Sequence, residues 1–180
     1  MSNELLNVIR GRRSVLRFTG EPVSEEELSK ILEAGRWAPS YANSQPWVFI
    51  VVKSEETKKK LGALVERIAL FRRGKVALSG HGLGDPAVVI VVAVDPMKDP
   101  RHHVEAGAAA TQNMALMAHA LGLASYWAGI YGEPAEREVR RILGLPRGYR
   151  VISILPIGKP AYQGESERAD LSELVRYEKF

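Results

Sequence analysis

The sequence predicts a single α+β domain built around a mixed β-sheet. The chain has 180 residues, enough for one domain with a sizeable core but too few for two. Two continuous apolar, β-branched runs have the length of buried strands, at residues 48–52 and 87–94. Segments with helical periodicity surround these strands, and no repeat, low-complexity tract or linker divides the chain. We therefore treat residues 1–180 as one domain.

The helices before and between these strands are predicted from apolar spacing and capping residues. Residues 3–13 place their leucines and isoleucine on one helical face. A second helix begins after Ser24, which has capping-box spacing to Glu27, and it ends before Pro39 because the residue before a proline disfavours helical angles. Ser54 opens a third, long helix after the first strand.

The second half of the chain alternates predicted helices and strands, at residues 103–121 (helix), 124–130 (strand), 134–144 (helix) and 151–157 (strand), with a short helix after Asp170. Gly122 suits the C-terminal cap of the first of these helices. Pro134 and Gly144 suit the first turn and the end of the second.

Two features point to self-association. The helix at residues 103–121 carries small residues in succession, Ala106–Ala110, and small side chains let a helix approach a partner helix or a flat ligand closely. The alternative is that this face packs internally. The end of the chain also carries apolar residues with no evident partner: Leu174, Val175, Tyr177 and Phe180.

Composition and charge exclude several classes of protein. The net charge of +4 is small and the basic residues are dispersed, with Lys58–Lys60 interpreted as a solvated helix face, so we expect no nucleic-acid partner. No apolar run approaches the roughly 20 residues of a membrane span, and the first residues lack the features of a signal peptide. Cysteine is absent, which excludes disulfides and thiolate chemistry. We expect a cytoplasmic protein without membrane association.

Familiar nucleotide, metal and hydrolase motifs are missing from the sequence. The closely spaced glycines at residues 80–84 follow no strand and open no helix, so they form neither a dinucleotide fingerprint nor a phosphate-binding P-loop. The four histidines show no ligand spacing, and we expect no metal. Ser14, Ser40 and Ser44 lack the context of a nucleophile elbow.

Basic residues near the end of the first helix are candidates for binding an anion. Arg12, Arg13 and Ser14, with Arg17 close by, offer planar donor forks and a hydroxyl that suit phosphate oxygens. The alternative is that the arginines only stabilise the negative end of the helix dipole. Arg168, before the last short helix, could likewise reach an anion or only solvent.

Two further segments suit the binding of a heterocycle. In the loop at residues 39–47, Asn43 and Gln45 each present an amide donor and a carbonyl acceptor, which match an imide-like edge; the alternative is an ordinary turn. After Trp127 and Ala128, the third strand carries Gly129, and a glycine there permits close approach of the backbone to a ligand.

Taken together, these segments resemble the nitroreductase family of flavin enzymes, in the same order and over nearly the whole chain. The matching motifs are Arg12-Arg13-Ser14, Pro39-Ser40 with Asn43-Ser44-Gln45-Pro46-Trp47, Glu105 with Ala109–Asn113 and Ala118–Leu123, Trp127-Ala128-Gly129 with residues 139–146, and residues 155–160. The chain departs at Leu16 and Ser166, where many members carry a basic residue. Arg17 is the candidate to supply the first missing charge.

The resemblance implies a mostly antiparallel sheet flanked by helices, in an entwined homodimer that binds one FMN at each of two sites shared between the chains. It implies that the phosphate and ribityl chain are held by Arg12, Arg13, Ser14 and Arg168. It implies that the partner subunit contributes Pro39, Ser40, Asn43 and Gln45. The backbone around Ala128 and Gly129, next to Trp127, would face N5 of the flavin.

The activity implied by the resemblance is hydride transfer from NADH or NADPH, through N5 of FMN, to a small organic acceptor such as a nitroaromatic or a quinone. The expected kinetics are ping-pong, and we assign no acid–base residue. The alternatives are a flavin-fragmenting or dehalogenating branch of the same superfamily, a flavin or deazaflavin binding module without turnover, and a helical-dimer interaction protein with an inactive site.

Overall fold

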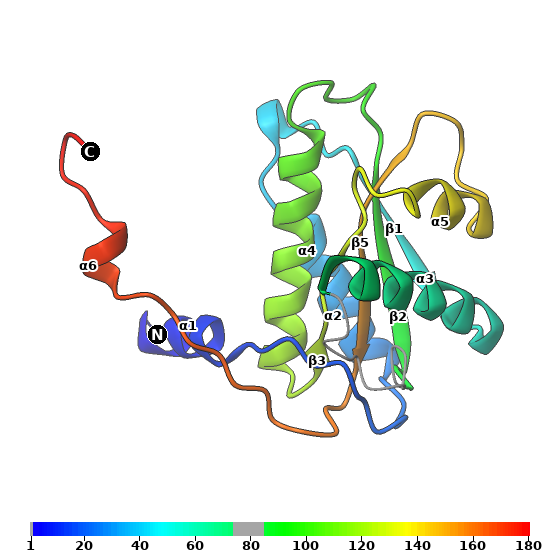
Figure 1. Cartoon of the computed structure of the whole chain (residues 1–180), viewed down its shortest axis with the longest axis horizontal. Helices are drawn as coiled ribbons and strands as arrows, with labels where there is room; N and C mark the ends of the chain where they lie inside the picture. Colours follow the sequence, from blue (N-terminus) through cyan, green and yellow to red (C-terminus); the bar gives the residue numbers. More distant parts are fainter. Residues whose placement is uncertain (1, 74–84) are drawn as a thin grey trace.

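The chain forms a β-sheet between two layers of helices (Figure 1). The computed structural model describes residues 2–73 and 85–180. The strands are β1 (Trp47–Val52), β2 (Val88–Val94), β3 (Ala124–Ser125), β4 (Ala128–Gly129) and β5 (Arg150–Gly158). The helices are α1 (Ser2–Gly11), α2 (Glu25–Arg36), α3 (Glu55–Arg73), α4 (His103–Ala120), α5 (Glu136–Ile142) and α6 (Leu171–Leu174), and η1 (Tyr41–Asn43) is a single 3₁₀ turn. The α+β prediction is confirmed.

All the paired strands are antiparallel, in the order β1-β2-β5-β3, and β4 also pairs with β5. The parallel part of the expected mixed sheet is an isolated bridge between Ser14 and Ser125. Alternate residues of β2 face opposite sides: Ile90 and Val92 pack toward α2 and α4, whereas Val91 packs toward α3 and α5. Because the sheet is covered on both faces, β2 appears in the sequence as one continuous apolar run.

The strand predicted at residues 124–130 is divided into β3 and β4. Both halves pair with β5 in one continuous register. Between them, the backbone N–H of Tyr126 donates to the carbonyl of Pro156 at 3.3 Å. Proline has no N–H to return the second bond of the pair, so the ladder is interrupted at this point.

Small residues on the inner face of α4 pack against the sheet. Ala106, Gly107 and Ala110 are buried, and a Cβ placed on Gly107 would lie only 2.5 Å from Cγ1 of Ile152. Internal packing, the second of the two alternatives, therefore holds for this face, and a partner helix is not needed to explain it. Beyond the exposed Glu105 in the first turn, the outer face of α4 is half-buried and carries small or uncharged side chains: Ala108, Ala109, Gln112 and Leu116.

One helix start follows its local sequence signal, and two other helix ends differ from the prediction by two residues. The capping box of α2 is present, with Ser24 and Glu27 each accepting a backbone N–H from the other. Helix α1 ends at Gly11, two residues earlier than predicted, since the chain then turns to bond β3 through the N–H of Val15. Helix α5 begins two residues after Pro134, so this proline precedes the first turn and does not lie in it.

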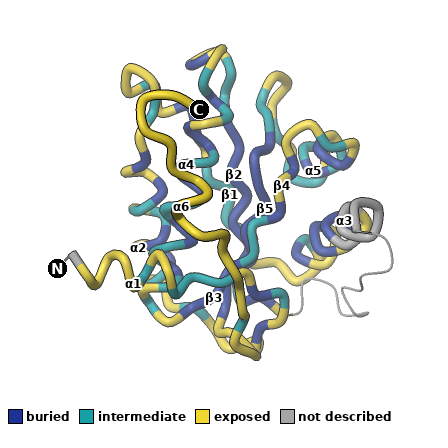
Figure 2. The backbone as a smooth tube through the Cα atoms, turned by 60° about the vertical axis from the view of Figure 1, so that its left-hand side comes forward, coloured by how far each residue is buried: buried dark blue, intermediate teal, exposed yellow. Residues whose placement is uncertain are grey.

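Both ends of the chain leave apolar side chains exposed. Leu5, Leu6 and Ile9, the predicted apolar face of α1, are 62%, 41% and 47% exposed. The chain beyond Ala161 extends away from the sheet through α6, and every residue in it is exposed apart from the half-buried Gly164 (Figures 1 and 2). The predicted glycine-rich segment at residues 80–84 lies outside the described residues. Among the helices that are described, none has both the length and the apolar character to cross a membrane.

Candidate functional site

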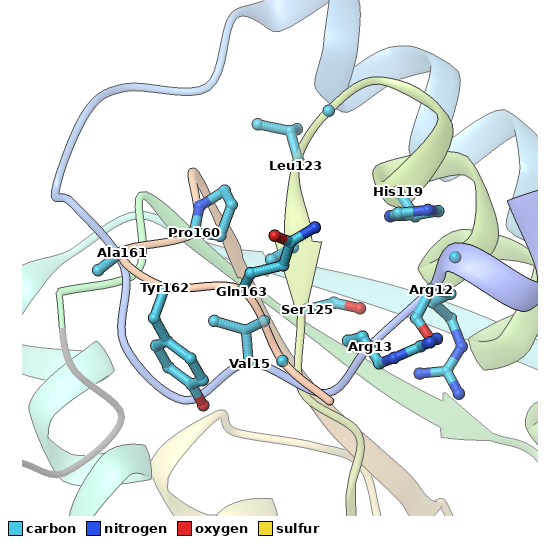
Figure 3. A pocket seen from close by; sticks show the side chains of 14 residues that line it. Arg12, Arg13, Val15, His119, Leu123, Ser125, Pro160, Ala161, Tyr162 and Gln163 are labelled. Atoms are coloured by element: carbon cyan, nitrogen blue, oxygen red, sulfur yellow. The ribbon is translucent and has the colours of Figure 1, made fainter. Parts of the chain in front are cut away.

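Arg12 and Arg13 line a cavity of about 450 Å³ (Figure 3). Its walls come from three places distant in the sequence: the end of α1, the C-terminal end of α4 with β3, and the segment that follows β5. Its polar lining includes His119, Ser125, Tyr162 and Gln163, in addition to the two arginines. The cavity is therefore built by the tertiary fold, around residues that the sequence predicted as anion ligands.

The cavity carries a concentrated positive charge. Burial, followed by the positive charges of Arg168 and Arg13, lowers the pKa of Arg12 below its ordinary value. The Nε of Arg13 is buried, and within the described residues it has no hydrogen-bond partner. Burial, followed by the charges of Arg13 and Arg12, also lowers the pKa of His119. An anion bound here would relieve the repulsion between the cations and give the buried N–H a partner.

Ser14 and Arg17, the other predicted ligands on this segment, are exposed and support the cavity through their backbone. Ser14 forms the bridge to β3, and the N–H of Ala161 donates to the carbonyl of Arg17 at 3.0 Å. The N–H of Leu16 donates to the hydroxyl of Tyr162 at 3.2 Å. The segment that follows α1 thus holds in place the segment after β5, which forms one wall of the cavity.

The second predicted cluster lies in the loop between α2 and β1. The side chains of Asn43 and Gln45 are exposed, as is Pro39, and Ser40 is half-buried. The hydroxyl of Ser40 accepts the backbone N–H of Gln45 at 3.0 Å. Ala42, Asn43 and Gln45 have positive φ angles of 47°, 56° and 45°, a conformation that non-glycine residues adopt only at an energetic cost.

Trp127, Ala128 and Gly129 differ in what they offer to a ligand. Trp127 is half-buried against the core on the α4 side of the sheet, and Ala128 is buried against the core on the other side. Gly129 is exposed, and a Cβ added there would meet nothing within 4 Å. The open approach to the backbone predicted at this glycine is therefore present.

The two predicted clusters lie at opposite ends of α4. Gly11 packs against the ring of His119, near the C-terminal end of the helix, whereas the ring of Tyr41 contacts the His102 ring at its N-terminal end, tilted by 32°. Along the axis of α4, the rise from His102 to His119 is about 25 Å. The structure therefore brings Arg12, Arg13 and Arg168 together, and it keeps Asn43 and Gln45 of the same chain far from them.

Several residues of the cavity were not predicted from the sequence. His119 matched the central-helix pattern but was considered only as a metal ligand, while Tyr162 and Gln163 follow a strand and carry no local signal. The packing of α1 on α4 and the turn after β5 place them, and neither is visible from spacing in the sequence. Among the described residues, no group of histidine, aspartate and glutamate side chains could hold a metal ion.

Comparison with known proteins gives consistent matches over most of the chain. Residues 9–159 match the model of the nitroreductase family. The chain is 33% identical over 171 residues to an Archaeoglobus fulgidus protein assigned as an NADH dehydrogenase or NAD(P)H nitroreductase, covering 93% of this chain and 91% of that protein. It is 32% identical to the Bacillus subtilis FMN reductase [NAD(P)H], covering 88% and 67% of the two chains. A Desulfovibrio desulfuricans protein solved in complex with FMN superposes with a TM-score of 0.79 at 34% identity, over 100% of this chain and 99% of that one.

Proposed function

This chain belongs to the nitroreductase family, and from that premise we propose that it is an FMN-dependent oxidoreductase that uses NADH or NADPH to reduce a small organic acceptor. The observation that carries the proposal is the pair of arginines, Arg12 and Arg13, that line one cavity, with the positive charge of Arg168 close enough to act on Arg12. Relatives named for FMN reduction with NAD(P)H, and one that binds FMN, support the choice of cofactor.

The residues present suit FMN. The arginine cluster, in which Arg13 Nε has no hydrogen-bond partner among the described residues, would hold the phosphate, and Ser14 would bind the ribityl chain. Trp127 and the backbone of Ala128 and Gly129 would lie beside the ring, because Gly129 leaves the approach open. When bound, FMN would supply the hydride chemistry. The chain's own residues would orient the ring and place donors where negative charge develops, without a dedicated general base.

The separation of the two clusters supports a homodimer with shared sites. A flavin mononucleotide is shorter than α4, so one molecule cannot reach from Arg12 to Asn43 within one chain. Two chains that pair their α4 helices in antiparallel fashion would bring these clusters together twice, by two-fold symmetry. In that arrangement Pro39, Ser40, Asn43 and Gln45 come from the partner subunit. The half-buried outer face of α4 is compatible with such a contact.

The proposal is tested by the visible spectrum of the protein with added FMN, before and after NADH or NADPH is supplied without oxygen. We expect a bound yellow flavin that is bleached by the nicotinamide. A yellow protein that is not bleached would favour a binding module, and failure to bind flavin would overturn the assignment.

The order of binding is tested by steady-state kinetics with both substrates varied. We propose that the nicotinamide and the acceptor use the same open face in turn, so double-reciprocal lines should be parallel. Converging lines would contradict this ping-pong scheme. Assays of oxygen consumption and halide release on halogenated aromatics separate it from the flavin-fragmenting and dehalogenating alternatives.

A further inference from the structure

We propose that Asp99 is a positioning residue that holds the loop at residues 40–45 in the conformation required to present Asn43 and Gln45 to the flavin. The inference rests on the proposed function for the identity of the ligand. We call the contacts of the Asp99 carboxylate with this loop and with the start of α4 the clamp. They lie within one chain, so the clamp can be tested separately from flavin binding.

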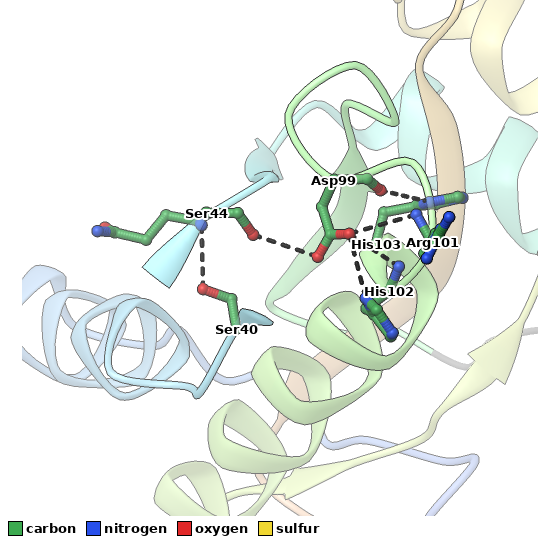
Figure 4. Close-up of polar contacts among 7 residues, drawn as sticks. Ser40, Ser44, Asp99, Arg101, His102 and His103 are labelled. Carbon is green, nitrogen blue, oxygen red and sulfur yellow. Dashed lines mark hydrogen bonds and ion pairs between the residues drawn. The ribbon is translucent and has the colours of Figure 1, made fainter. Parts of the chain in front are cut away.

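The carboxylate of Asp99 joins two segments that are far apart in the sequence (Figure 4). Its Oδ2 accepts the hydroxyl of Ser44 at 3.3 Å. Its Oδ1 accepts the backbone N–H groups of His102 at 2.9 Å and Arg101 at 3.3 Å, immediately before α4. Asp99 is only 4% exposed, so these donors replace the water that the carboxylate loses on folding.

The charge state of Asp99 fits this role. Burial raises its pKa, but the hydrogen bonds from His102 and Arg101, the charge of His102 and the Ser44 hydroxyl together outweigh burial, and the pKa lies below its usual value. The ionised carboxylate only accepts hydrogen bonds. It therefore fixes the direction of the Ser44 hydroxyl as a donor.

The loop needs such support because its backbone is strained. Ala42, Asn43 and Gln45 have left-handed φ angles, and non-glycine residues keep such angles only where surrounding contacts determine them. Within the loop, the Ser40 hydroxyl and the carbonyls of Ser40 and Tyr41 accept backbone N–H groups. These local bonds close the turn but do not place it relative to the rest of the molecule.

Contacts from the segment between β2 and α4 place the turn. The Tyr41 ring lies 4.7 Å from the His102 ring, and the N–H of Asp95 donates to the carbonyl of Pro46 at 2.8 Å. The Ser44–Asp99 bond lies between these two contacts, next to both Asn43 and Gln45. Asp99 thus ties the strained part of the loop to the N-terminal end of α4, the helix proposed to pair across the dimer.

The first experiment compares Ser44→Ala and Asp99→Ala with the wild type by hydrogen exchange and FMN titration. Loss of a hydrogen bond to a charged group costs about 10- to 100-fold in an equilibrium. We expect FMN to bind 10- to 100-fold more weakly in each variant, with a shifted visible flavin spectrum and faster amide exchange in residues 42–45 without flavin. Because Asp99→Ala already removes the contact that Ser44→Ala removes, the double variant should lose little more than Asp99→Ala alone.

Two further variants separate positioning from general stability. Asp95→Asn is the matched control, since the Asp95 side chain accepts the nearby N–H of Met97 at 2.9 Å and the change keeps an acceptor there, so the loop should stay unchanged. Asp99→Asn keeps the size and one acceptor, so it should recover part of the affinity lost in Asp99→Ala. Unchanged exchange in residues 42–45 in both Ser44→Ala and Asp99→Ala would overturn the clamp, as would equal effects of Asp95→Asn. If the wild type bound no FMN, the proposed function would fail while the exchange data would still decide the clamp.

Discussion

At the scale of single residues, the positive charge of the cavity gives the clearest indication of what the candidate site binds. Arg12, Arg13 and Arg168 come from two ends of the chain, and burial together with the charges of Arg168 and Arg13 lowers the pKa of Arg12. His119 shares this field. Such an arrangement is unfavourable in the free protein and becomes favourable when an anion enters.

The titration of His119 should report the anion. Its pKa is lowered in the folded protein, so the charged form is disfavoured there relative to the unfolded chain. The neutral His119 therefore costs the folded protein no stability above the unfolded pKa of about 6.5. As the pH falls from there toward the lowered folded pKa, the free energy of unfolding decreases. Bound phosphate or FMN should raise the pKa of His119, which NMR titration of its ring protons can follow.

Arg12→Ala is the informative control for this titration. Removing one of the two repelling charges should raise the pKa of His119 without any anion, and it should weaken the response to added phosphate. His119→Gln identifies the resonance. The same midpoint with and without a saturating anion would contradict the assignment of this cavity as the phosphate site.

At the scale of elements, features that depend on neighbouring residues in the sequence were predicted well, and features that depend on tertiary contacts were not. The Ser24–Glu27 capping box and the β2 run depend on neighbours in the sequence, and both are present in the structure. The break between β3 and β4 depends on Pro156 in the facing strand, so no pattern within residues 124–130 could show it. The inner face of α4 was open to two interpretations because small residues suit a sheet as well as a partner helix.

The contact between α4 and the sheet predicts the effect of Gly107→Ala. The new Cβ would lie 2.5 Å from Cγ1 of Ile152 and 3.0 Å from Cγ1 of Val94, both in branched core residues. Overpacking of this kind costs about 1–3 kcal/mol, and the better helix propensity of alanine returns about 1 kcal/mol. We expect the free energy of unfolding in urea to fall, by up to about 2 kcal/mol. Gly129→Ala, where a Cβ meets nothing within 4 Å, should change it little.

At the scale of the whole molecule, the described part of a single chain exposes apolar surfaces and keeps the two groups of predicted flavin-binding residues apart. The apolar side of α1 and the segment after residue 165 are exposed, and the two clusters of predicted flavin ligands are separated by the length of α4. The sequence indicated both the tail and the clusters, since each is a local pattern. Their separation could not be predicted from spacing, because it depends on the packing of α1 and η1 at opposite ends of one helix.

Removal of residues 171–180 tests the role of the tail. This change keeps Arg168 and deletes exposed apolar residues, among them Leu171, Leu174 and Tyr177, which are 71%, 68% and 88% exposed. If they pack on a partner subunit, their loss should raise the dissociation constant of the dimer at least about tenfold, as measured by sedimentation over a concentration series. Full-length Arg168→Ala should keep the dimer and weaken only FMN binding. An unchanged dissociation constant would exclude the tail from the interface.

Complementation between two inactive variants tests the shared site directly. Arg12→Ala and Asn43→Ala should each weaken FMN binding about 10- to 100-fold, because each removes ligands from every site of its own homodimer. In a mixed dimer, the intact Arg12 of one chain meets the intact Asn43 of the other at one site, while the second site carries both changes. Mixing should therefore restore about one functional site per heterodimer, once mass spectrometry confirms that subunits exchange. If exchange occurs and no flavin binding returns, the two residues do not meet across the interface, and the antiparallel pairing of α4 would have to be abandoned.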